Sequence, residues 1–267
     1  MPTIRADHRT RRRVAAVAAL ALTALLGASA CSGERPHLAD DVTPRDPSAT
    51  TTSASVAPTP TTEAPLGPGE SLVAEAVVPN LVAYTSPEMT EVAAELANPT
   101  DVGGPLVFLV AQRTERALEV HLPLRPNGSK GWVEASDVSL AVNPYKITVR
   151  LSSHELVLEK DGEVVRVEPV GLGKADVPTP GGVFYIKELL QPPNPKGAYG
   201  PFAYGLSGFS TELTDFEGGE GVIGIHGTND PSSVGIDSSH GCIRMHNDTI
   251  TELTEILPLG TPVEIVA

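Results

Sequence analysis

The stretch at residues 225–247 reads IHGTNDPSSVGIDSSHGCIRMHN. It holds His226, His240 and His246, three of the chain's seven histidines, and Cys242, one of its two cysteines. A cysteine attacks carbon as the thiolate, and its ordinary pKa of about 8.5 leaves the thiol mostly protonated at neutral pH. A nearby imidazole can accept that proton. The stretch therefore predicts a thiol nucleophile assisted by a histidine.

The turn that carries the cysteine is Ser239-His240-Gly241-Cys242. Glycine lets a chain turn tightly and approach a bound molecule closely. The backbone N–H groups of Gly241 and Cys242 are then candidates for an oxyanion hole, which stabilises the negative oxygen that forms when sulfur attacks a carbonyl.

Two other interpretations of this cluster are open. A lone cysteine is often a small buried hydrophobic residue. His226, His240, Cys242 and His246 could also hold a metal ion as four ligands. Zinc sites usually show paired close spacings, and here only the segment from His240 to His246 is compact. We favour thiol catalysis and expect neither a metal nor a cofactor.

A family resemblance appears at the same residues. His226, a gap of twelve residues, and then Ser239-His240-Gly241-Cys242-Ile243-Arg244 resemble the signature of the L,D-transpeptidase family, whose catalytic domain is the YkuD-like domain. The resemblance covers residues 143–267, and Arg244 stands where many members carry Asn. It implies a mostly β catalytic domain with one or two helices.

The resemblance also implies roles for the site residues. Cys242 attacks the carbonyl of the third residue in a donor tetrapeptide stem of peptidoglycan and expels the terminal D-Ala. An amine of a neighbouring stem then resolves the thioester and gives a 3→3 cross-link. His226 is the general base and later the acid, and the carbonyl of Gly227 fixes its tautomer. Ser239 and His240 match motif positions and organise the turn.

Other residues have less certain roles. Tyr204 lies in a segment that resembles the family's strand beside the substrate groove. Arg244 contacts a stem-peptide carboxylate or forms an ion pair that shapes the loop. His246, beyond the motif, is expected at the surface or at a helix cap. Two further functions stay open: an L,D-carboxypeptidase, which uses water as acceptor, and a non-catalytic wall-binding lipoprotein.

The beginning of the chain predicts export. Arg9 and Arg11-Arg12-Arg13 precede the apolar run 14–26, which is too short to span a membrane and is typical of a signal peptide over residues 1–30. The small residues 27–30 followed by Cys31 resemble a bacterial lipobox, which implies a lipidated Cys31 at the outer face of the cytoplasmic membrane. Ordinary cleavage after residue 30 is the alternative.

The net charge of −14 argues against a nucleic-acid partner.

The rest of the chain divides by composition. Residues 31–70 are rich in Pro, Thr and Ser, which predicts a disordered tether. Residues 71–142 show short apolar runs and resemble a small SH3-like β-barrel. Its Tyr84 and Trp132 could bind wall glycan or peptide, although we favour a place in the core. Helices are expected only at residues 86–97 and 247–257, and a hairpin turn at residues 160–162.

Overall fold

The computed structural model describes residues 66–215 and 219–267. The predicted signal peptide, the lipidation site at Cys31 and most of the predicted tether lie outside these residues. These residues all belong to one compact unit. Within the part of the chain that the structure describes, no helix is long and apolar enough to cross a membrane.

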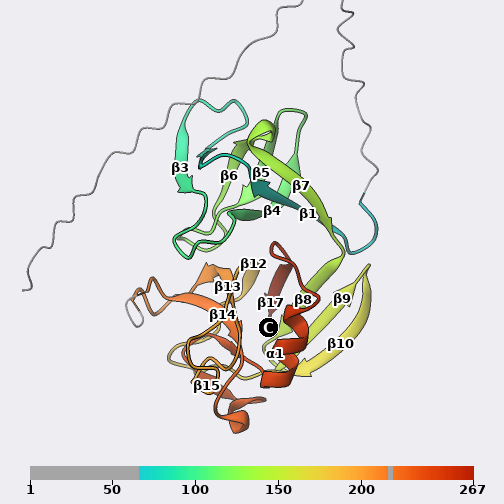
Figure 1. Cartoon of the computed structure of the whole chain (residues 1–267), viewed down its shortest axis with the longest axis vertical. Helices are drawn as coiled ribbons and strands as arrows, with labels where there is room; N and C mark the ends of the chain where they lie inside the picture. Colours follow the sequence, from blue (N-terminus) through green and yellow to red (C-terminus); the bar gives the residue numbers. More distant parts are fainter. Residues whose placement is uncertain (1–65, 216–218) are drawn as a thin grey trace, which may run out of the picture. The chain divides into compact units, whose positions relative to one another are not determined.

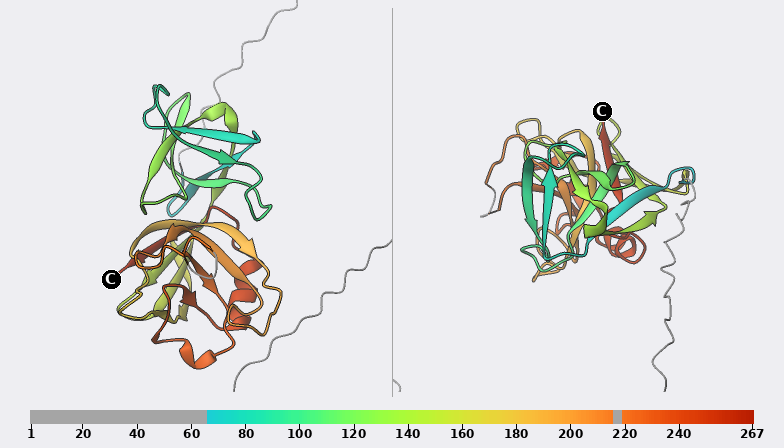
Figure 2. Two further views of the ribbon diagram at one scale, coloured as in Figure 1. Left: turned by 90° about the vertical axis from the view of Figure 1, so that its left-hand side faces the viewer. Right: turned by 90° about the horizontal axis from the view of Figure 1, so that it is seen from above.

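The first sheet is antiparallel throughout, and its strands follow the order β3-β2-β6-β5-β4-β1-β7 (Figure 1). The two views of Figure 2 show these strands curling around a shared core. Alternate residues of β5 and β6, such as Leu118, Val120 and Val133, are fully buried in that core, as expected for half-buried strands. The strands are β1 (Ser71–Ala76), β2 (Asn80–Tyr84), β3 (Val92–Ala97), β4 (Val107–Arg113), β5 (Ala117–His121), β6 (Lys130–Glu134) and β7 (Val138–Asn143), with a 3₁₀ turn η1 (Ala135–Asp137).

The predicted helix over residues 86–97 is wrong. Residues 92–97 form strand β3, which pairs with β2 from Asn80 opposite Ala97 to Tyr84 opposite Val92. The residues before it form a turn in which Met89 has a positive φ of 56°. The Glu and Ala of this segment favour a helix locally, but pairing with a strand brought alongside by the fold outweighs that weak preference.

The aromatic pair of the first sheet lies outside its core. Tyr84 and Trp132 are directly opposite each other on β2 and β6, and both are half-buried. Their chain neighbours Ala83 and Val133 are fully buried. Because successive side chains of a strand point to opposite faces, the two aromatics lie on the face away from the core. The preferred core placement was therefore wrong, while binding of glycan or peptide stays a prediction.

The second sheet has the order β10-β9-β8-β17-β12-β13-β14-β16. Two of its neighbouring pairs are parallel, β8 with β17 and β14 with β16, and the others are antiparallel. A separate parallel pair joins β11 to β15. The elements are β8 (Tyr145–Arg150), β9 (Glu155–Lys160), β10 (Glu163–Pro169), β11 (Leu172–Gly173), β12 (Gly182–Leu190), β13 (Ala203–Phe209), β14 (Val222–His226), η2 (Pro231–Ser233), β15 (Asp237–Ser239), β16 (Ile243–Arg244), α1 (Asn247–Thr254) and β17 (Pro262–Val266).

The predicted hairpin between β9 and β10 is confirmed. Asp161 and Gly162 both have positive φ, 53° and 80°, and Lys160 pairs with Glu163. Two consecutive residues of that conformation suit the right-handed twist of the strands they join. The mainly β fold with few helices is likewise confirmed, because α1 is the one α-helix among the described residues.

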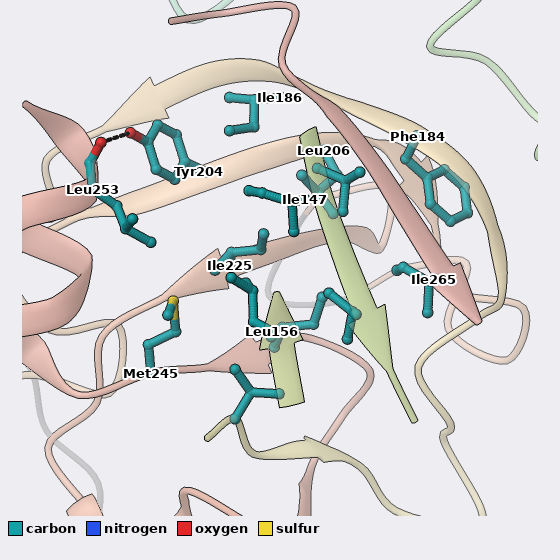
Figure 3. Close-up of a cluster of buried hydrophobic side chains, with 14 of the residues drawn as sticks. Ile147, Leu156, Phe184, Ile186, Tyr204, Leu206, Ile225, Met245, Leu253 and Ile265 are labelled. Carbon is teal, nitrogen blue, oxygen red and sulfur yellow. Dashed lines mark hydrogen bonds between the residues drawn. The ribbon is translucent and has the colours of Figure 1, made fainter. Parts of the chain in front are cut away.

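The core of the second sheet fixes the helix that follows the cysteine turn (Figure 3). Ile250 and Leu253 of α1 are buried against β13 and β14 residues such as Leu206 and Ile225. The hydroxyl of Tyr204 donates a hydrogen bond to the carbonyl of Leu253 at 3.0 Å. The helix therefore cannot move without disturbing the strands that carry the site.

Candidate active site

The ends of two neighbouring strands bring the motif together. β14 ends at His226, and β16 runs parallel to it with Arg244 opposite His226. Cys242 immediately precedes β16, so the pairing of these strands places it beside the last residues of β14. His226 and Cys242 line the same cavity of about 250 Å³. His226 and the turn that carries Cys242, which are separated by twelve residues in the sequence, therefore lie in one site.

The imidazole of His226 is buried and fixed in orientation. Only 4% of the residue is exposed. Its Nδ1–H donates to the carbonyl oxygen of Gly227 at 2.5 Å, and a carbonyl can only accept, so the proton of the neutral ring is on Nδ1. The ring of Tyr199 packs edge-on against it with centroids 4.9 Å apart. The other ring nitrogen, Nε2, therefore keeps its lone pair for a proton.

Both reacting groups are neutral at rest. Burial lowers the pKa of His226 to about 4; the hydrogen bond to Gly227 opposes this, and the charge of Arg244 lowers the pKa further. Burial raises the pKa of the Cys242 thiol, while a backbone hydrogen bond with Gly224 and the charge of Arg244 lower it. At neutral pH the site holds a thiol beside an uncharged imidazole.

Ser239 braces the cysteine turn from inside. It is 1% exposed, and its hydroxyl donates to the carbonyl of Cys242 at 2.6 Å. The same oxygen accepts the N–H of Gly241 at 3.1 Å. Gly241 has a φ of 106°, a conformation that glycine adopts most readily. The N–H of Gly241, an expected oxyanion donor, is thus already bound to Ser239.

The other two histidines of the stretch 225–247 lie at the surface. His240 is exposed and borders the cavity. His246 is exposed at the N-cap of α1, where its side chain makes no capping hydrogen bond. The side chain of Asn247, the first residue of α1, accepts the N–H of Thr228 through its Oδ1 at 2.8 Å. Among residues 66–215 and 219–267, no group of three or more His, Cys, Asp or Glu is arranged to hold a metal ion.

Arg244 places a positive charge beside the cavity. The residue is half-buried and lines the cavity with Cys242. Its Nε is buried and has no hydrogen-bond partner, and no ion pair joins it to another described residue. A guanidinium left unpaired in this way can accept an anion from a bound molecule.

Tyr204 serves the core more than the cavity. It is 1% exposed, its hydroxyl is bonded to α1, and burial raises its pKa. The residues that sequence reasoning missed are Tyr199, which packs on His226, and Gly224, whose backbone bonds Cys242. Tyr199 lies in the Pro/Gly-rich loop after β12, and nothing in the spacing of that loop pointed to His226.

A second cavity of about 550 Å³ also touches His226 and Cys242. Apolar residues such as Pro192, Tyr199 and Val222 line it, together with the carboxylate-bearing Glu188 and Glu220. Cys242 therefore borders two cavities, a smaller one lined by Arg244 and a larger, mostly apolar one that also contains two glutamates.

Comparisons with known proteins place the second sheet in a known family. Residues 144–265 match the family model of the L,D-transpeptidase catalytic domain, YkuD. The L,D-transpeptidase YkuD of Bacillus licheniformis is 40% identical over 122 residues, which are 46% of this chain and 66% of that protein. The L,D-transpeptidase YqjB of Bacillus subtilis is 38% identical over 136 residues, 46% of this chain and 71% of that protein.

One solved structure is similar to part of this chain. A mutant L,D-transpeptidase from Enterococcus faecium is 27% identical, with 46% of this chain and 50% of that chain covered and a TM-score of 0.36. The chain spans just under two thirds, 66%, of the length of the Bacillus licheniformis relative. The matched residues include the ends of β14 and β16 and the turn between them. On the strength of these relatives, the chain belongs to the L,D-transpeptidase family.

Proposed function

We propose that this protein is a cysteine-dependent peptidoglycan L,D-transpeptidase that forms 3→3 cross-links in cell wall biogenesis. One observation carries the proposal: a buried His226, held by the Gly227 carbonyl with its proton on Nδ1, lines the same cavity as Cys242. An imidazole fixed in this tautomer is a general base, because Nε2 can accept the thiol proton.

In the first step, Sγ of Cys242 attacks the carbonyl carbon of the third residue of a donor tetrapeptide. His226 takes the thiol proton during the attack, since both groups are neutral beforehand. The N–H of Cys242 stabilises the oxyanion, joined by that of Gly241 when it leaves Ser239. Collapse of the intermediate breaks the C–N bond, and the proton on His226 passes to the departing amine of D-Ala.

In the second step, the side-chain amine of a diamino acid in a neighbouring stem attacks the thioester. His226 accepts a proton from that amine and returns it to the leaving sulfur of Cys242, which restores the thiol. The new amide is the cross-link. Atoms and charges balance without any cofactor or external oxidant.

The two cavities support an amine acceptor. Arg244 gives the smaller one a cation with an unpaired Nε, which suits a donor stem that carries carboxylates. Glu188 and Glu220 border the larger one, and Glu188 pairs with Lys187 at 3.4 Å. Carboxylates near an apolar wall favour a peptide that brings an ammonium group. Space of this size beside the thioester suits a second stem peptide better than water alone.

The predicted location fits this substrate. A signal peptide, a lipidated Cys31 and a tether would hold the enzyme on the outer face of the cytoplasmic membrane, facing the wall. Cys31→Ala is expected to shift the mature protein from the membrane fraction to the soluble exported fraction and to leave acylation of Cys242 unchanged. Membrane partitioning equal to that of the unaltered protein would refute the anchor.

The decisive test is incubation of the mature protein with disaccharide tetrapeptides, followed by mass spectrometry of the products. We expect dimers linked 3→3, release of D-Ala, and no product with Cys242→Ala. Tripeptide without dimers would identify an L,D-carboxypeptidase. Binding to wall fragments without any release of D-Ala would instead support a non-catalytic wall-binding lipoprotein.

A further inference from the structure

One wall of the Cys242 cavity is formed by residues that follow β13 and by one that precedes β14. Ser210, Leu213 and Gly221 are these residues. The N–H of Ser210 donates to the carbonyl of Gly221 at 2.8 Å, and the Ser210 hydroxyl accepts the N–H of Leu213 at 3.0 Å. Gly221 has a φ of 70°, so a side chain there would be strained. These bonds define the base of the wall.

The pairing of strands alone does not hold this wall. The register between β13 and β14 shifts before Phe209, which then pairs with Val222. The ladder of β13 with β12 ends at Leu206 opposite Ile186, so Phe209 lies beyond it. A backbone that leaves a ladder must find other partners for its N–H and C=O groups. Those partners come from the first sheet.

Arg125, on the loop between β5 and β6, binds three carbonyls of the wall. Its Nη1 donates to Ser210 at 2.9 Å, and its Nη2 donates to Leu213 at 3.0 Å and to Glu220 at 2.8 Å. The guanidinium also stacks on the ring of Phe209, 4.8 Å from its centroid. A planar fork with several donors suits this task, and a lysine ammonium cannot reproduce its geometry.

Asn127, on the same loop, completes the end of β13. Its Nδ2 donates to the carbonyl of Phe209 at 2.7 Å, and its Oδ1 accepts the N–H of the same residue at 2.9 Å. The side-chain amide thus replaces a neighbouring strand at the point where the register shifts. Phe209 is only 3% exposed, so these backbone groups would otherwise be short of partners.

We propose that Arg125 and Asn127 are positioning residues for the active site, which makes the first sheet part of the catalytic apparatus. They hold Ser210, Leu213 and Gly221 at the distance from Cys242 that a bound acyl donor requires. The role rests on the proposed function, since the wall matters for a donor that fills the cavity. A small reagent that needs only the thiol does not depend on it.

The test compares Arg125→Ala, Arg125→Lys and Asn127→Ala in the full mature chain carrying Cys31→Ser, so that Cys242 is the sole thiol. Arg116→Ala is the matched control, because Arg116 is an exposed arginine on another turn of the same sheet. We expect the second-order rate of Cys242 acylation by a carbapenem to fall about tenfold or more, as misplaced binding walls do. Alkylation by iodoacetamide should match the control.

Amide hydrogen exchange provides the readout that does not depend on catalysis. The variants should exchange faster at residues 209–213 and 219–222 and normally along β8 and β9. Acylation and exchange equal to those of Arg116→Ala would overturn the proposal. So would a parallel loss of acylation, alkylation and melting temperature, which would show a general folding defect.

The two proposals fail in different ways. If the unaltered protein neither reacts with the carbapenem nor releases D-Ala, the proposed function is wrong. Exchange at the wall then decides alone whether Arg125 and Asn127 hold it, and unchanged exchange would reject that role.

Discussion

His226 and His240 both border the Cys242 cavity, but a strand places the first and a turn places the second. His226 ends β14, which pairs with β13 on one side and β16 on the other, and the residue is 4% exposed. His240 is exposed between β15 and β16. The hydrogen bond to the Gly227 carbonyl fixes the tautomer of His226, and burial lowers its pKa. The comparison shows that backbone pairing and burial, rather than residue type, set these two histidines apart.

Removal of the buried imidazole tests the comparison most severely. His226→Ala should lower Cys242 acylation by about 100- to 10,000-fold, the usual contribution of a general base. Stopped-flow measurement of carbapenem acylation would give the rate, with circular dichroism to verify folding. A folded His226→Ala protein that keeps its rate, beside an inactive His240→Ala protein, would reverse the two roles.

The pH dependence of the unaltered enzyme sharpens the same point. A base must be neutral to accept a proton, and burial lowers the pKa of His226 to about 4. Activity should therefore persist as the pH falls to 5 and decline only near 4. An exposed imidazole with a pKa of 6.5 would be about 3% neutral at pH 5, a loss of about thirtyfold. A decline in kcat/KM centred well above pH 4 would contradict His226 as the base.

Ser239 ends β15 at the start of the cysteine turn and is as buried as His226, so its effect should fall between those of the two histidines. Ser239→Ala removes the donor to the Cys242 carbonyl and the acceptor of the Gly241 N–H. We expect acylation to fall about tenfold, because a displaced nucleophile reacts more slowly. Ser238→Ala, which removes a hydroxyl bound to the carbonyl of Ser233, is the control from the same strand. Equal acylation rates in the two variants would contradict the proposal that Ser239 holds the cysteine turn in place.

The exposed histidine should matter least. His240→Ala is expected to change the acylation rate by less than about threefold, since the proposed mechanism assigns general-base assistance, which is worth about a hundredfold or more, to His226. The rate of thiol alkylation at several pH values would measure any change in the reactivity of Cys242. A drop as large as that of Ser239→Ala would show that His240 organises the turn as firmly as the serine does.

Local patterns predicted much of the fold and the motif. The alternation of β5 and β6, the turn at Asp161-Gly162 and the helix after the cysteine turn all depend on neighbouring residues, and the structure contains each. The family resemblance named His226 and Cys242 before their cavity was known. The hydrogen bond between His226 and Gly227 was likewise expected from it, and it joins adjacent residues.

Contacts between distant segments were not predictable in this way. The local sequence of residues 92–97 favours a helix, and it is the pairing with β2 that makes this segment a strand. Tyr84 and Trp132 lie on the outer face because the register between β2 and β6 puts their neighbours inside. Tyr199 on His226 and Arg125 on the cavity wall both depend on how the chain returns to the site, which leaves no spacing signal in the sequence.

The neutral state of Cys242 has a consequence for durability. Peroxides and stray disulfides react with the thiolate, so a cysteine that is held protonated is oxidised slowly. The raised pKa keeps the Cys242 thiol in that form, and in the proposed mechanism it loses its proton to His226 only when a substrate reacts. The signal peptide is predicted to direct this protein outside the cytoplasm, where conditions are oxidising and a permanently ionised cysteine would be lost to sulfenic acid or mixed disulfides. The same raised pKa that lowers the reactivity of the resting thiol therefore protects it from oxidation between turnovers.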